Sequence, residues 1–189
     1  MNSQRIAWYL TAALMSAVFG NLLLVPATLG ATQGTPGATS TGTINISASV
    51  ASRVRITNLS DVSFPGVDVT SNVSNAQNVC VWSNTATKGY NITATGNGAS
   101  SAFTLDGGAS TSPMPYSVQW NQSSGQTSGT ALTKGVALTG QISTATNQTC
   151  AGGPSATASL IVSILATDLA SAVSSTTYSG VLTLVVAPE

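Results

Sequence analysis

The chain carries very little charge. Of its 189 residues, five are Lys or Arg, five are Asp or Glu and none is His, so the formal net charge is zero. A nucleic-acid-binding surface needs clustered Lys and Arg to neutralise phosphates, and this chain has too few. Without histidine there is no Ser–His or Cys–His nucleophile pair and no imidazole metal ligand. We therefore expect a protein that is not an enzyme and has no metal or cofactor.

The acidic residues offer one remaining route to catalysis, a pair of carboxylates. The aspartates are widely spaced along the chain, at Asp61, Asp68, Asp106 and Asp168. Asp106 precedes Gly107 and Gly108, which is a typical turn sequence. Spacing alone leaves a two-carboxylate hydrolase site open, but turn formation is the simpler explanation of each aspartate.

The N-terminus has the pattern of an export signal. Arg5 is followed by an apolar stretch from Ile6 to Val25 and then by Pro26. Small residues provide cleavage points at Ala27 or Ala31. We predict a signal peptide over residues 1–31; the alternative is an uncleaved membrane anchor, since the stretch approaches spanning length.

Two cysteines, Cys80 and Cys150, follow the predicted signal. An even number of cysteines in an oxidising compartment predicts one structural disulfide. The metal-ligand or reactive-thiol alternative lacks partner residues such as histidine.

Polar positions are dominated by Ser, Thr, Asn, Gln and Gly, which suit turns and the outer faces of strands. Residues 32–41 contain only such small residues, Pro and Ala, and predict a flexible lead-in. Residues 43–50 then alternate strictly between polar and apolar types, which predicts a strand. Its apolar face would carry Ile44, Ile46, Ala48 and Val50.

Further short apolar runs follow at intervals typical of all-β folds, separated by Gly, Ser and Asn turns. They lie at residues 54–56, 79–82, 90–94, 103–105, 114–120, 132–142, 158–166 and 178–186. The run at 158–166 is the most apolar and predicts a central strand. Two packed antiparallel sheets are the expected architecture for residues 51–189, with an up-and-down barrel as second choice.

The aromatic residues allow two interpretations. Trp82, Tyr90, Tyr116 and Trp120 would form a stacking platform for sugars if they gathered on an exposed face. Aromatic side chains in strands more often fill the core, and we favour packing. A secreted carbohydrate-binding or adhesin module using Trp82, Tyr116 and Trp120 is the alternative function.

Several short segments resemble bacterial pilins of the chaperone–usher pathway. TINISASV, MPYSVQW and TYSGVLTLVV resemble the alternate, colonisation-factor class. DVSFPG, Cys80, YNITATG and FTLDGG resemble the spore coat protein U domain of archaic pilins. Together these segments cover most of the chain after the signal, in the order those families show.

The resemblance implies an incomplete immunoglobulin-like β-sandwich that polymerises by donor-strand exchange. Residues 32–50 would supply the N-terminal donor strand, with Ile44, Ile46, Ala48 and Val50 as its plugs. The acceptor, also the strand that a chaperone would bind, would carry Tyr178, Leu182, Leu184 and Val186. Implied partners are copies of the chain or related pilins, a periplasmic chaperone and an outer-membrane usher. The implied location is a cell-surface pilus, in adhesion or biofilm formation on a host or abiotic surface.

Alternation of apolar and polar residues shows which side chains of a strand share a face, but it does not show which strand pairs with it. The alternative for residues 43–50 is therefore an ordinary first strand that pairs within its own domain.

Overall fold

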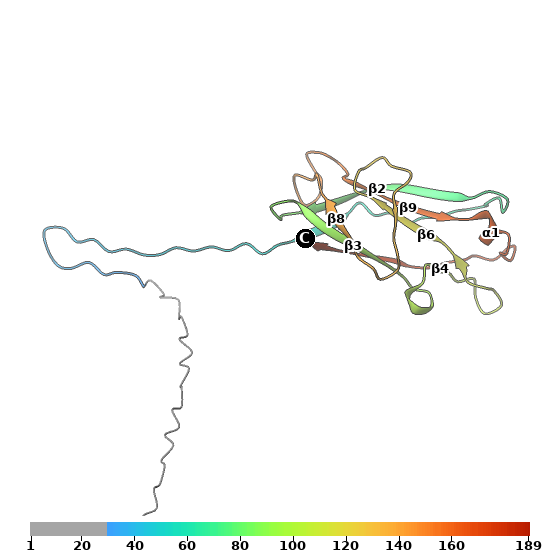
Figure 1. The fold of residues 1–189 in the computed structure, drawn as a ribbon, viewed down its shortest axis with the longest axis horizontal. Helices are drawn as coiled ribbons and strands as arrows, with labels where there is room; N and C mark the ends of the chain where they lie inside the picture. The colour runs from blue at the N-terminus through green and yellow to red at the C-terminus, as the bar shows by residue number, and fades with distance from the viewer. Residues whose placement is uncertain (1–29) are drawn as a thin grey trace, which may run out of the picture. The chain divides into compact units, whose positions relative to one another are not determined.

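The computed structural model describes residues 30–189, so the predicted export signal lies, up to residue 29, outside the described residues (Figure 1). The chain divides into two units, one ending at Ser49 and a body over Val50–Glu189. In the described part, no helix has the length and apolar character needed to cross a membrane.

The body is built almost entirely of antiparallel β-strands, as predicted. Its two short helical segments are a 3₁₀ turn at Ala99–Ser101 and α1 at Ala166–Leu169. The strands are β1 Val54–Thr57, β2 Val73–Ser83, β3 Gly89–Gly96, β4 Thr104–Leu105, β5 Met114–Pro115, β6 Ser117–Asn121, β7 Thr130–Ala131, β8 Leu138–Ile142, β9 Ala158–Ile164 and β10 Leu182–Pro188.

The strands form a five-stranded sheet in the order β1-β2-β9-β6-β7 and a three-stranded sheet in the order β10-β3-β8. A short hairpin, β4-β5, forms a third sheet. β9 lies in the middle of the largest sheet, between β2 and β6, and six of its seven residues are buried. The prediction of a central strand at this run is therefore confirmed.

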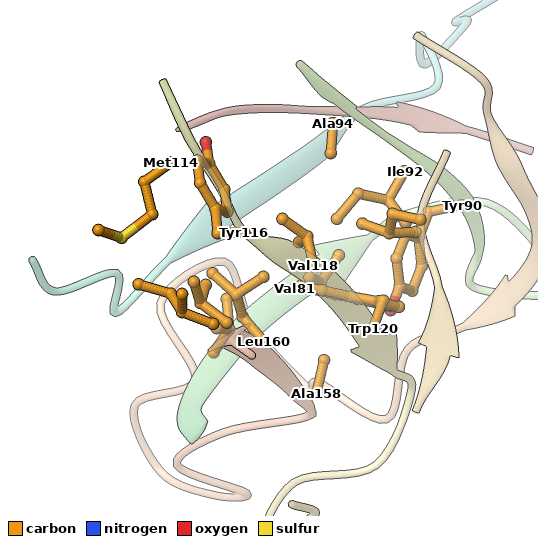
Figure 2. Packing of buried hydrophobic residues seen from close by; sticks show 14 of the residues in the cluster. Val81, Tyr90, Ile92, Ala94, Met114, Tyr116, Val118, Trp120, Ala158 and Leu160 are labelled. Carbon is orange, nitrogen blue, oxygen red and sulfur yellow. The ribbon is translucent and has the colours of Figure 1, made fainter. Parts of the chain in front are cut away.

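Side chains from both larger sheets share one apolar core (Figure 2). The alternation predicted for residues 114–120 is confirmed, because Met114, Tyr116, Val118 and Trp120 are buried whereas Ser117 is exposed. Burial of these side chains, together with Ile92 of β3, supplies the hydrophobic free energy that holds the sheets together.

The first half of β2 is strand that the sequence does not signal. Residues 74–78 are polar except for Ala76, yet they pair in continuous register with β9. The side-chain amide of Gln77 accepts from the Ser60 N–H at 2.8 Å and donates to the Ser60 carbonyl at 3.0 Å. These bonds tie the half-buried Gln77 to the loop that precedes the strand.

The predicted disulfide is confirmed, since Cys80 of β2 is joined to Cys150. Both cysteines are buried with Ala145 in a second, smaller apolar cluster, against which Trp82 packs. The bond ties β2 to the loop that precedes β9.

Candidate functional site: an open sheet edge and an exposed apolar segment

β10 is an edge strand whose second edge has no strand beside it in the described residues. It pairs with β3 in unbroken register from Leu182↔Gly96 to Pro188↔Tyr90. Just beyond the two ends of this ladder, Asn97 donates to the Val181 carbonyl and Glu189 donates to the Gly89 carbonyl, each at 3.1 Å.

Antiparallel partners alternate between hydrogen-bonded and non-bonded pairs. Because the pairs at Val181 and Glu189 are bonded, the pairs at Leu182, Leu184 and Val186 are non-bonded. The N–H and C=O groups of these three residues therefore point away from β3. Pro188 occupies the next non-bonded position after Val186. Proline, which has no N–H, is tolerated there because the pairing with β3 needs no donor at this position.

The same three residues turn their side chains inward. Leu182, Leu184 and Val186 are half-buried and pack against the core, while Thr183 and Val185 between them are exposed. We call Leu182, Leu184 and Val186 the open edge. It combines unpaired backbone groups with apolar side chains that are only partly covered.

Tyr178, predicted to share this strand, lies outside it. The strand begins at Leu182, and Tyr178 precedes it in a loop where its hydroxyl accepts from the Val173 N–H at 3.1 Å. Its ring packs against the core from there. Of the predicted acceptor residues, the structure thus brings Leu182, Leu184 and Val186 together and leaves Tyr178 apart.

β1 contributes a second free edge next to β10. The Asn84 N–H donates to the Arg53 carbonyl in line with the β1–β2 register, so Val54 and Ile56 occupy non-bonded positions. Their backbone N–H and C=O groups therefore point away from β2. Their side chains are half-buried on the same core. β1 and β10 lie near each other without pairing.

The segment at residues 43–50, which we call the apolar segment, forms no strand in this single chain. Ile44 is 74% exposed, and Ile46 and Val50 are each 87% exposed. Ala48 is exposed as well. A strand is stabilised by hydrogen bonds to a neighbour, so period two alone does not produce one. In the isolated chain these residues form no strand, so the alternative of an ordinary first strand is wrong, and the donor strand stays a prediction.

The lead-in before this segment closes on itself. Thr32 and Thr43 exchange two backbone hydrogen bonds, at 2.9 and 3.1 Å, and their hydroxyls lie 2.6 Å apart. The loop closed in this way ends at Thr43, the first residue of the apolar segment.

The aromatic residues do not form an exposed platform. Tyr90, Tyr116 and Trp120 are buried, and Trp82 is half-buried against the disulfide. Trp120 donates from Nε1 to the Tyr90 hydroxyl at 3.1 Å, and the two rings meet edge to face at 6.4 Å (Figure 2). Burial raises the pKa of Tyr90 to about 12, an effect that the hydrogen bond from Trp120 partly opposes. These rings pack, as favoured from the sequence.

Polar groups elsewhere on the body serve local structure. The Asp106 carboxylate accepts from the Gly108 N–H, and that of Asp68 accepts from Thr70, whose hydrogen bonds lower the pKa of Asp68. Both are turn contacts, as the sequence suggested. Within residues 30–189 no three His, Cys, Asp or Glu side chains gather where they would hold a metal ion.

A polar depression lies beside Trp120, between the end of β6, the start of β7 and Gln141 of β8, but several of its side chains are already hydrogen-bonded within the body. Asn121 donates to the Ser128 carbonyl and accepts from the Ser123 N–H, and Gln122 accepts from the Ile142 N–H. It offers few free groups to a ligand.

No protein-family model matches the chain, and a search of curated proteins gives no significant match.

Proposed function

We propose that the chain is a structural subunit of a bacterial surface pilus that polymerises by donor-strand exchange. One observation carries the proposal: the same chain has an unpaired, partly uncovered sheet edge and an exposed segment patterned to fill such an edge. The body is then an immunoglobulin-like sandwich that is one strand short, and the apolar segment of a second copy completes it.

The two parts match in period and chemistry. Same-face side chains in a strand repeat every second residue, about 6.6 Å apart. The open edge shows this repeat at Leu182, Leu184 and Val186, and the apolar segment shows it from Ile44 to Val50. Pairing would join backbone groups along β10 and place alternate side chains on the core, which is recognition by β-augmentation.

The proposed contact would also bury enough apolar surface to be stable. Burying two Ile, one Val and one Ala contributes on the order of 5–7 kcal/mol before the cost of ordering the segment. Each copy would accept one segment and donate another, so the contact is head-to-tail and builds a fibre.

The predicted export signal and the disulfide are both consistent with assembly outside the cytoplasm. A periplasmic chaperone would first lend a strand to the open edge, and an outer-membrane usher would then exchange it for the apolar segment of the next subunit. The finished fibre would support adhesion or biofilm formation on a host or abiotic surface.

Deleting residues 32–50 tests the proposal, because it removes the donor and leaves the body from Ala51 onward. We expect fibres to disappear while a chaperone-bound monomer persists. Deleting residues 32–42 alone is the matched control and should preserve fibres. Persistence of long fibres without residues 43–50 would refute the donor assignment.

A peptide of residues 43–50 provides a second test on the intact chain. Added in excess during assembly, it should shorten the fibres and slow hydrogen exchange at the amides of Leu182, Leu184 and Val186. A peptide with Ile44 and Ile46 replaced by Ser should do neither.

A further inference from the structure

The apolar segment and the open edge belong to the same chain, so the segment could pair with its own edge instead of the edge of a second copy. The apolar segment ends at Val50, and β1, which lies near β10, begins at Val54. A segment tethered this closely has an effective concentration of about 1 mM for its own edge. We call the pairing of the segment with the open edge of its own chain self-capping. At a chain concentration of about 10 µM, self-capping would then be favoured over pairing with a second copy by about 100-fold. In a chain that refolds without a chaperone, polymerisation therefore requires a feature that prevents self-capping.

Asn84 holds the three residues between the apolar segment and β1. Its Oδ1 accepts from the Arg53 N–H at 2.6 Å, its backbone N–H donates to the Arg53 carbonyl at 3.1 Å, and its Nδ2 donates to the Ala51 carbonyl at 2.9 Å. β2 ends at Ser83, so the side-chain amide of Asn84 stands where the next peptide group of the strand would be. The ladder is thereby extended to Arg53 and Ala51.

For the apolar segment to lie against its own body, the chain must reverse direction between Val50 and Val54. A tight reversal needs new dihedral angles and new partners for the backbone groups at its centre. Those groups belong to Ala51 and Arg53, and Asn84 already holds them in line with β1.

We propose that Asn84 is a positioning residue that blocks self-capping and so selects a second copy of the chain as the occupant of the open edge. The inference rests on the proposed function. It adds that the partner is chosen by how residues 51–53 are held, and not by the sequence of the apolar segment.

The test compares the wild-type chain with Asn84→Ala and Asn84→Asp. Asp keeps an oxygen for the Arg53 N–H but loses the donor to the Ala51 carbonyl. Each chain is refolded at about 10 µM, a concentration chosen so that the tethered reaction dominates when permitted. Size-exclusion chromatography measures the ratio of monomer to multimer, and hydrogen exchange reports on Leu182, Leu184 and Val186 in the monomer.

We expect Asn84→Ala to raise the monomer-to-multimer ratio at least tenfold, with the amides of the open edge protected in the monomer. Asn84→Asp should fall between Ala and wild type. Asn72→Ala is the control, because Asn72 makes a comparable contact, to the Ala166 N–H, at the start of α1. An unchanged ratio in Asn84→Ala, with wild-type multimers present, would overturn the inference.

The peptide of residues 43–50 separates this failure from failure of the proposed function. If the peptide protects the open edge of the wild-type chain but Asn84→Ala does not alter the ratio, only the role of Asn84 is wrong. If the peptide does not protect the open edge, the proposed function itself is wrong. Should Asn84→Ala fail to fold, the ratio measured with Asn84→Asp decides.

Discussion

Exchanging the residues at positions 46 and 47 tests the physical basis of the proposed contact. The double variant Ile46→Ser/Ser47→Ile preserves composition, length and hydropathy, but moves one large apolar side chain to the opposite face of the segment. A one-residue shift of a period-two pattern reverses which face a side chain occupies. The variant therefore changes the pattern alone.

The expected magnitude follows from exposure. Ile46 is 87% exposed in the single chain, so nearly all of its side chain is available for burial in a fibre. Full burial of such a side chain contributes about 2 kcal/mol, which corresponds to about 30-fold in the dissociation constant of one subunit contact. The free energy of unfolding of the single chain should change by less than about 0.5 kcal/mol, because the residue is already in solvent.

Two measurements check this expectation. Dissociation of the multimers in denaturant or on heating should accelerate about 30-fold, and denaturant unfolding of the chaperone-free monomer should not change. Val185→Ser is the control, since Val185 is exposed on the outward face of β10 and its replacement should leave multimers intact. Equal stability of wild-type and swapped multimers would refute the claim that alternate side chains of this segment become buried.

Three further predictions concern the body. Replacing Cys80 and Cys150 by Ala removes a bond that closes 70 residues, and denaturant unfolding should show a loss of about 4 kcal/mol in the chain-entropy model; a loss under about 1 kcal/mol would contradict it. Trp120→Phe leaves the buried Tyr90 hydroxyl without its donor and should cost about 1–3 kcal/mol in the same assay, whereas Tyr90→Phe/Trp120→Phe should recover part of it. The pKa of Tyr90 is raised from 10.0 to about 12 in the folded chain, so the unfolded chain loses this proton first and stability should fall as pH rises from about 10 to 12. Tyr90→Phe should flatten that part of the pH profile.

The sequence predicted those strands whose side chains alternate around a core. Met114, Val118 and Trp120 alternate with polar residues, and the apolar run of β9 is flanked by turn residues, so pattern and burial agree. It did not predict residues 74–78 of β2, because their stability comes from backbone pairing with β9 and from the bonds between Gln77 and Ser60. Contacts between residues far apart in sequence leave no local periodicity.

The candidate site was predictable only in part, for a related reason. Alternation identified Leu182, Leu184 and Val186 as one face, and Ile44 to Val50 as another. Which faces acquire partners depends on sheet order, which the sequence does not state. Tyr178 was misplaced because its ring packs on the core as a strand residue would, although it belongs to a loop. The contacts of Asn84 gave no sequence signal, since Asn is common throughout this chain.

The scarcity of charge and the open edge favour the same conclusion about assembly. Proteins usually protect a free strand edge with Lys, with Pro or with a covering loop. The edge strand has no charged residue, its one proline, Pro188, stands at its end, and the described apolar segment is equally uncharged from Thr43 to Val50. Such an edge pairs with whichever uncharged strand it meets first, and a chain of zero net charge has little repulsion to prevent it. Under the proposed function, the subunit would need a strand placed on β10 from the moment it folds. That requirement favours a chaperone that donates a strand over one that merely shields apolar surface.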